Sequence, residues 1–302
     1  MKLSVVVPCY NEVANVSEFE SELSKTLLKE KITYEIIFVD DGSTDDTYNK
    51  LSSLNKANKN VKVIRFSRNF GKESAMLAGL KNASGSYVAI MDADLQHTPE
   101  MLILMYKKLI NDDSFDCCCA YKSNREDEGS LKRTLTSLFY KINNKISDVK
   151  LLPGASDFRV FKKSVCDAIT SLDEKTRFLK GMFSWVGFNT IYVPYMPEKR
   201  MYGTSKWSLF KLLKYSLGGI ISFSTKPIKS VFIIGVLALI VGLLNFILIG
   251  NLSNRTIILF ISLIMLSIGI ISLYVSRIYS NILNRPCYII KEKLGFNDKS
   301  SK

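Results

Sequence analysis

The chain has 302 residues, of which 47% are hydrophobic, and a formal net charge of +13. This length allows one or two domains with a sizeable core, and the sequence has no zinc-finger, RNA-recognition or basic-zipper pattern. We therefore assign the excess of positive charge to an anionic membrane surface and not to nucleic acid, because the apolar residues are concentrated late in the chain.

The six cysteines do not form the pattern of a disulfide framework. Cys117, Cys118 and Cys119 are consecutive, and no CxxC pair is present. Free thiols are typical of a reducing compartment. The apolar part of residues 1–8 is too short for a signal peptide. We therefore expect the N-terminal part of the protein to remain in the cytoplasm.

Residues 3 to about 120 alternate between strand and helix patterns. Apolar runs typical of buried parallel strands occupy residues 3–7, 34–39, 61–66, 87–91 and 115–120. Helices are predicted between them at residues 16–29, after the capping residue Thr44, at 73–82, and from Pro99 to about 110 behind the cap Thr98. This alternation predicts an α/β fold with a mostly parallel sheet that is covered by helices on both faces.

Polar clusters follow four of the predicted strands, at residues 10–12, 40–41, 67–72 and 92–96. The carboxyl ends of parallel strands meet at one edge of a sheet, which is where such folds bind ligands. The sequence therefore predicts a single site built from these four clusters.

Asp92, Asp94 and Gln96 alternate directly after a predicted strand. In an extended chain they share one face, and two carboxylates with an amide oxygen suit Mg²⁺ or Mn²⁺, commonly shared with substrate phosphates. The alternative is a solvated acidic loop. For the only histidine, His97, a packing or surface role is favoured over a role as a metal ligand.

The middle of the chain is mixed. Short strands are predicted at 154–161 and 190–193, and residues 130–146 have the pattern of a basic amphipathic helix. That helix either lies on a membrane or docks on the sheet. Residues 198–207 are basic and predict a mobile loop, and residues 208–223 predict a helix at a membrane interface.

Residues 230–250 and 256–276 are two uncharged apolar segments. Each spans roughly 31 Å as a helix, about the thickness of one hydrocarbon core. Positive charges flank the pair on both outer sides, so both ends are expected to face the cytoplasm. The predicted organisation is a catalytic domain over 1–205, a juxtamembrane amphipathic helix over 206–227, two transmembrane helices within 228–280, and a cytoplasmic tail over 281–302.

Four motifs occur in order: Val5-Val-Val-Pro-Cys-Tyr-Asn-Glu12, Val39-Asp-Asp-Gly-Ser-Thr-Asp45, Ser67-Arg-Asn-Phe-Gly-Lys72 and Met91-Asp-Ala-Asp-Leu-Gln96. Together they resemble the family 2 inverting glycosyltransferases, which have the Rossmann-like GT-A fold. The Asp157-Phe-Arg159 and Arg200-x-Tyr-Gly-x-Ser-Lys206 motifs and the C-terminal apolar pair narrow the resemblance to polyprenyl-phosphate glycosyltransferases, such as bactoprenol glucosyltransferases and dolichyl-phosphate mannose synthase.

The resemblance implies a role for many residues. It implies a nucleotide-sugar site formed by Pro8, Tyr10, Asn11, Glu12, Asp40, Lys72, Asp92, Ala93, Asp94, Arg200 and Lys206. Asp92, Asp94 and Gln96 are the implied ligands of Mg²⁺ or Mn²⁺, and Asp94 and Asp157 are the implied catalytic residues. For Tyr10 and Glu12 the alternative is loop capping, and for Arg200 and Lys206 it is contact with lipid headgroups.

A lipid phosphate acceptor changes what is expected of Asp157. A phosphate monoester has a second pKa of about 6 and is mostly a dianion at pH 7, so it needs little help from a general base. We therefore expect Asp157 to orient a substrate or remove a residual proton. The alternative is a structural role, in which Asp157 forms an ion pair with Arg159. Candidates for binding the acceptor phosphate are Arg125, Lys132 and Arg133.

The sequence thus predicts a membrane-anchored, metal-dependent transferase in the plasma membrane with both termini in the cytoplasm. From the resemblance, it is expected to move a hexose from a nucleotide sugar, UDP-glucose or another UDP-hexose, to undecaprenyl or another polyprenyl phosphate. Its expected partners are these two substrates, the lipid bilayer and a second copy of the chain. The alternatives are a GDP-mannose-dependent mannosyltransferase, a polysaccharide synthase, and a non-catalytic protein that binds nucleotide sugars.

Overall fold

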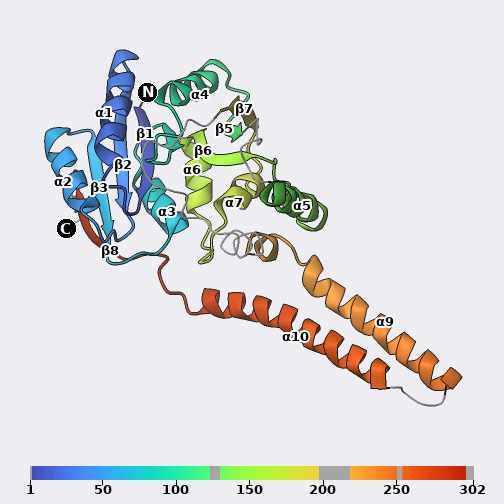
Figure 1. Cartoon of the computed structure of the whole chain (residues 1–302). Helices are drawn as coiled ribbons and strands as arrows, with labels where there is room; N and C mark the ends of the chain where they lie inside the picture. Colours follow the sequence, from blue (N-terminus) through green and yellow to red (C-terminus); the bar gives the residue numbers. More distant parts are fainter. Residues whose placement is uncertain (1, 123–129, 197–217, 250–253, 297–302) are drawn as a thin grey trace.

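The structure, a computed structural model, describes residues 2–122, 130–196, 218–249 and 254–296. An α/β domain is followed by a long hairpin of two helices that projects away from it, and the chain then returns to the domain (Figure 1). This arrangement places the end of the described chain beside its first strands.

Eight strands form one sheet in the described part of the chain, in the order β7-β5-β6-β4-β1-β2-β3-β8. Their bounds are β1 Lys2–Cys9, β2 Thr33–Asp40, β3 Val61–Phe66, β4 Tyr87–Ile90, β5 Cys117–Lys122, β6 Ala155–Lys162, β7 Thr190–Tyr195 and β8 Ile290–Leu294. Only β6 and β8 run antiparallel to their neighbours. The prediction of a mostly parallel sheet is therefore confirmed.

Helices cover both faces of this sheet. One face carries α1 (Val16–Lys29), α2 (Thr47–Ala57) and α4 (Pro99–Asn111), and the other carries α3 (Lys72–Asn82), α6 (Lys163–Thr170) and α7 (Leu179–Trp185). The alternation along β1 shows why: Val5 and Val7 enter the first core and Val6 enters the second. Strands that are buried on both faces give the continuous apolar runs seen in the sequence.

The start of α2 differs from the prediction, whereas the start of α4 agrees with it. Thr44 does not cap α2: its backbone N–H donates to Asn11 Oδ1, and the helix begins at Thr47 behind Asp46. Thr98 does cap α4, because its hydroxyl accepts a hydrogen bond from the backbone N–H of Met101.

Helix α3 packs very closely on β1. A Cβ atom on Gly79 would lie 2.2 Å from Cγ1 of Val6, so no larger residue fits between the helix and the strand. This close packing helps to position α3, whose first residue is Lys72.

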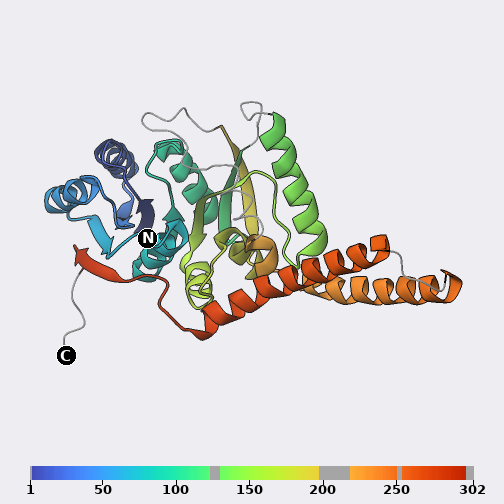
Figure 2. The ribbon, with the colours of Figure 1, turned by 60° about the horizontal axis from the view of Figure 1, so that its bottom comes forward.

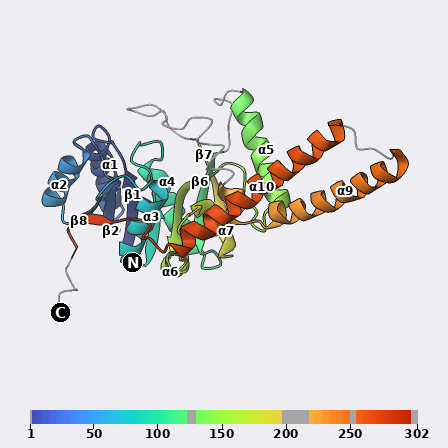
Figure 3. The same cartoon turned by 90° about the horizontal axis from the view of Figure 1, so that it is seen from below.

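The hairpin consists of α9 (Lys226–Ile249) and α10 (Asn254–Ile282). Both helices are long and apolar enough to cross a membrane, and their apolar side chains are largely exposed, with Phe232 75% exposed. The start of α9 lies beside the end of α5 (Ser130–Ile146), where the Lys226 ammonium donates to the carbonyl of Lys145 (Figure 3).

Helix α5 itself is only partly docked. Phe139 and Tyr140 pack against the core, while Leu138 and Ile142 remain 50% and 41% exposed. Helix α5 therefore contacts the core and at the same time keeps apolar side chains exposed to its surroundings.

The base of α10 contacts the domain. The guanidinium of Arg277 donates to the carbonyl of Thr176 at 2.8 Å, and the backbone N–H of Lys175 donates to Asn281 at 3.4 Å. Since the start of α9 also contacts the domain, both ends of the hairpin lie on the same side.

The segment predicted as a tail contains β8, which completes the sheet beside β3 (Figure 2). The ring of Tyr288 stacks on Phe66 with 4.9 Å between ring centres, and Ser67 N–H donates to the carbonyl of Ile289. The sequence Ile290-Lys-Glu-Lys-Leu294 carries three charges because β8 is an exposed edge strand, so it lacks the apolar run that identified the other strands.

Candidate active site

Asp92 and Asp157 face each other because of the pairing between β4 and β6. The two strands are antiparallel with Ile90 opposite Arg159, and Asp92 and Asp157 each lie two residues from this last pair, at the same end of the two strands' pairing. The ammonium of Lys72 lies between them, 2.7 Å from Oδ1 of Asp92 and 3.1 Å from Oδ2 of Asp157. Three elements distant in sequence thus form one charged cluster at the edge of the sheet where β4 ends and the antiparallel β6 begins.

The carboxylate of Asp157 also has a second cation beside it, Lys180 of α7, at 3.9 Å. Burial favours protonation of Asp157, but Lys72 and Lys180 outweigh it and hold its pKa well below the usual range. Arg159 is not its ion-pair partner in the described structure. The guanidinium of Arg159 instead donates to the carbonyl of Ser156 and lies over the ring of Phe183. Nothing in the sequence pointed to Lys180, which belongs to a short, unpredicted helix.

The loop between β3 and α3, residues 67–71, positions Lys72. Its backbone is held by the buried carboxylate of Asp41, which accepts hydrogen bonds from the N–H groups of Phe70 at 2.6 Å and Gly71 at 2.9 Å. Sequence reasoning assigned no role to Asp41 individually. Asp41 therefore holds the β3–α3 loop in the conformation that places Lys72 in the site.

The backbone of the residue after Asp41 is constrained as well. Gly42 has a φ of +64°, and a Cβ atom there would lie 2.3 Å from the carbonyl carbon of Arg68. Only glycine allows the β3–α3 loop to cross at this distance. Burial is the main cause that raises the pKa of Asp41 to about 6, although the two N–H donors oppose it.

Replacing Asp41 by Asn is expected to lower kcat/KM by about tenfold, because an amide offers one acceptor oxygen to two N–H groups and lets Lys72 move. In the wild type, activity should weaken below pH 6 as Asp41 protonates.

The stability of the fold should respond differently to acid. The pKa of Asp41 in the folded chain is above the ordinary value, so protonation between pH 6 and 4 does not destabilise the fold through this group. Kinetics and melting temperatures at pH 5 and 8 test this, with Asp46→Asn as the control; equal acid sensitivity in Asp41→Asn and the wild type would contradict it.

Asp40 has a buried oxygen suited to a ligand. Its Oδ1 accepts the N–H of Ser43 at 3.0 Å, and its Oδ2 lies 3.7 Å from Nε of Arg65. Within the described residues Oδ2 accepts no hydrogen bond. A buried carboxylate oxygen in this state can accept an N–H from a bound base.

The loop after β1 contacts the loop before α2. The N–H of Asn11 donates to the hydroxyl of Ser43 at 3.0 Å, and the N–H of Glu12 donates to that of Thr47 at 2.8 Å. These contacts hold the predicted cluster at residues 10–12 against the segment that leads from β2 into α2. Pro8 and Tyr10 are half-buried beside it.

The metal-ligand motif has a different shape from the one predicted. Strand β4 ends at Ile90, and the following residues turn, with Leu95 at a φ of 57°. The extended-chain argument therefore does not apply to Asp92, Asp94 and Gln96. Oδ1 of Asp94 accepts the backbone N–H of Gln96 at 3.3 Å, so the turn itself keeps these two residues together.

These residues fit a divalent cation only in part. No group of three or more His, Cys, Asp or Glu side chains in the described ranges forms a metal cluster. Asp92 and Asp94 with the amide of Gln96 still offer hard oxygen donors, and substrate phosphates and water usually complete such a shell. Since the ammonium of Lys72 contacts Asp92, a metal ion would share that carboxylate with it.

His97 has a packing role, as predicted. It is buried, its Nε2 lies 3.0 Å from the hydroxyl of Tyr195, and its ring centre lies 4.6 Å from that of Phe158. Burial lowers its pKa. Ala93, also implied by the resemblance, is buried at the start of the turn.

Several predicted residues are not located by the structure. Arg125, Arg200 and Lys206 lie outside the described residues, and Lys132 and Arg133 belong to α5 but their side chains are outside the described set. Their roles stay predictions.

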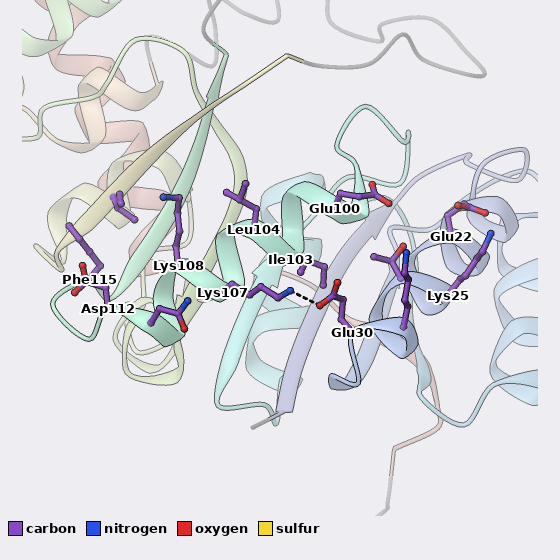
Figure 4. Close-up of a pocket in the computed structure, with 14 residues that line it drawn as sticks. Glu22, Lys25, Glu30, Glu100, Ile103, Leu104, Lys107, Lys108, Asp112 and Phe115 are labelled. Atoms are coloured by element: carbon purple, nitrogen blue, oxygen red, sulfur yellow. Dashed lines mark hydrogen bonds and ion pairs between the residues drawn. The ribbon is translucent and has the colours of Figure 1, made fainter.

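A groove of about 890 Å³ lies elsewhere, between α1 and α4 (Figure 4). It is lined by lysines and acids in similar number, and Lys107 pairs with Glu30 across it. None of the strand-end clusters contributes to it. It is therefore separate from the candidate active site.

Comparison with known proteins places the chain in a family. Residues 4–170 match the model described as glycosyl transferase family 2. A putative glycosyltransferase of Bacillus subtilis, CsbB, is 37% identical over 303 residues, which cover 96% of this chain and 91% of the relative. The chain belongs to glycosyl transferase family 2.

The sequence similarity of this glycosyltransferase to a further relative also covers the C-terminal hairpin. The SfII prophage-derived bactoprenol glucosyl transferase of Shigella flexneri is 35% identical and is covered over 98% of its length by 97% of this chain. A crystal structure of a mycobacterial protein is 16% identical with a TM-score of 0.50, over 73% of this chain and 72% of that one, and shows likeness of fold alone. The family match and the mostly parallel sheet agree with the GT-A fold that the sequence predicted.

Proposed function

We propose that this glycosyltransferase moves a hexose, with inversion, from a nucleotide sugar to a polyprenyl phosphate. The observation that carries the proposal is the charged cluster of Asp92, Lys72 and Asp157 on a domain joined to an apolar helical hairpin. Full-length similarity to a bactoprenol glucosyl transferase supports it.

The donor is proposed to be a UDP-hexose, with glucose suggested by the name of that relative. Oδ2 of Asp40 is suited to accept an N–H from the base, and both uracil and guanine have such a donor. GDP-mannose is therefore the donor to test beside UDP-glucose.

Mg²⁺ or Mn²⁺, held by Asp92, Asp94 and Gln96, would neutralise the charge that develops on the departing nucleoside diphosphate. Lys72 lies beside the same carboxylate and adds positive charge to this end of the site. Its position supports a role in binding the diphosphate.

The nucleophile is proposed to be the phosphate dianion of the acceptor. Asp157 suits a role in orienting the sugar or Lys72 better than a role as a base, because a carboxylate with so low a pKa holds a proton poorly. The acceptor itself carries the negative charge that the reaction needs.

The hairpin is proposed to cross the membrane and return. Both of its ends contact the domain, so the domain and both flanks share one side. The positive flanks predict that this is the cytoplasmic side of the plasma membrane.

The test is transfer of label from a nucleotide sugar to lipid. Purified enzyme with Mg²⁺, polyprenyl phosphate and labelled UDP-glucose should give a labelled lipid, and EDTA should stop the reaction. Asp94→Asn should lower the rate by about 10²-fold or more, with Asp113→Asn, an exposed surface carboxylate, as the control. No labelled lipid with UDP-glucose, GDP-mannose or other common donors would refute the proposal.

A further inference from the structure

Lys180 lies between the charged cluster and the base of the hairpin. Its helix, α7, packs against Phe223, three residues before α9 begins: a Cβ atom on Gly181 would lie 2.4 Å from the ring of Phe223. The side chain of Lys180, the residue before Gly181, reaches to within 3.9 Å of the carboxylate of Asp157. The lysine thus joins the membrane end of the domain to the active site.

Four charged groups alternate across the site: Asp92, Lys72, Asp157 and Lys180. Lys72 is within 3.1 Å of both carboxylates, and Lys180 is 3.9 Å from Asp157 on its other oxygen. Under the proposed function, the metal and the leaving diphosphate would be bound at the Asp92 end of this row. Lys180 is the cation at the opposite end.

An inverting displacement requires the acceptor phosphate and the leaving diphosphate to be bound at opposite ends of the site. The acceptor oxygen attacks the anomeric carbon from the face opposite the leaving group, so the acceptor phosphate and the diphosphate lie on opposite sides of the sugar. The oxygen–carbon bond forms while the bond from that carbon to the diphosphate oxygen breaks, and its electron pair leaves with the diphosphate. A dianionic acceptor needs to lose no proton in this step.

We propose that Lys180 binds the phosphate of the lipid acceptor, an inference that rests on the proposed function. In the described structure its ammonium makes one short hydrogen bond, to the carbonyl of Ala155 at 3.0 Å. An ammonium has three N–H donors, so it can donate to a phosphate as well. The side chain is 25% exposed, which leaves it accessible from the site.

Asp157 then has a defined task. It lies between Lys72 and Lys180 and keeps each ammonium in place, so that one cation serves the donor side and the other serves the acceptor side. Lys180 contacts the acceptor directly, whereas Asp157 acts by positioning both lysines.

The test separates binding of the lipid from binding of the donor. Lys180→Gln should raise KM for polyprenyl phosphate by about 10- to 100-fold, with KM for the nucleotide sugar and the calorimetric affinity for UDP with Mg²⁺ unchanged. Lys180→Arg keeps the charge and should restore most of the lipid affinity. The control is Lys163→Gln, because Lys163 likewise donates to a backbone carbonyl and pairs with an aspartate, but on the remote helix α6.

The outcomes are distinct. If the wild type transfers sugar and Lys180→Gln keeps its lipid KM, or if both substrates' KM values rise together, the inference is wrong and the proposed function stands. If the wild type transfers sugar to no lipid phosphate, both fail. Should Lys180→Gln not fold, the same comparison between wild type and Lys180→Met decides, with UDP affinity as the check of an intact donor site.

Discussion

Replacing Lys72 by Met is expected to lower kcat/KM by about 10²- to 10³-fold. The change leaves the carboxylates of Asp92 and Asp157 facing each other without the cation between them. Burial acts to lower the pKa of Lys72, but the two carboxylates outweigh it and raise the pKa above its usual value, so the lysine is charged throughout the working range. Steady-state kinetics at several donor concentrations measures the effect.

The control for Lys72 lies on the same helix. Lys81 is exposed in the last turn of α3, and Lys81→Met should keep wild-type activity. Without Lys72, the paired carboxylates should also take up a proton more readily, so the remaining activity of Lys72→Met should fall earlier in acid than that of the wild type. A loss below tenfold, or an unchanged acid profile, would contradict the bridging role.

The second large effect is expected for Asp157→Asn, with a loss of about 10²-fold or more in kcat/KM. An amide does not hold Lys72 and Lys180 as a carboxylate does. The shape of the pH profile is the sharper measurement. We expect activity to fall below about pH 6, where the acceptor phosphate gains a proton, in the wild type and in Asp157→Asn alike.

Two comparisons make that pH profile interpretable. Asp41 also titrates near pH 6, so the profile is best measured in the Asp41→Asn background, which leaves the acceptor as the group that titrates there. Asp167→Asn is the control, because Asp167 is an exposed partner of Lys163 on α6. Loss of the acid limb in Asp157→Asn would instead identify Asp157 as the group that accepts a proton.

The sequence was sufficient for the elements whose burial is uniform. Strands β1 to β4 are buried on both faces, so their apolar runs were visible, and α1, α3 and α4 follow from apolar spacing and one proline. The polar strand ends then predicted the location of the site. Each of these inferences depends on local pattern alone.

The rest depends on pairing between distant segments. The antiparallel direction of β6 brings Asp157 to Asp92, and no local pattern records that direction. Lys180 and Asp41 act through contacts across 23 and 29 or 30 residues, with Asp157 and with the β3–α3 loop. The turn after Ile90 could not be foreseen either, because the alternation of Asp92, Asp94 and Gln96 is compatible with an extended chain.

The place of β8 in the chain sets an order for biosynthesis. The ribosome makes β1 to β7 first, then both helices of the hairpin, and only then the strand that covers β3. Domains generally fold from the N-terminus during synthesis, and an uncovered edge strand is prone to pair with other chains. A newly made copy therefore keeps an open edge next to Arg65 and Asp40 until its hairpin has turned back. The sheet can therefore be completed by β8 only in copies whose hairpin has already been synthesised.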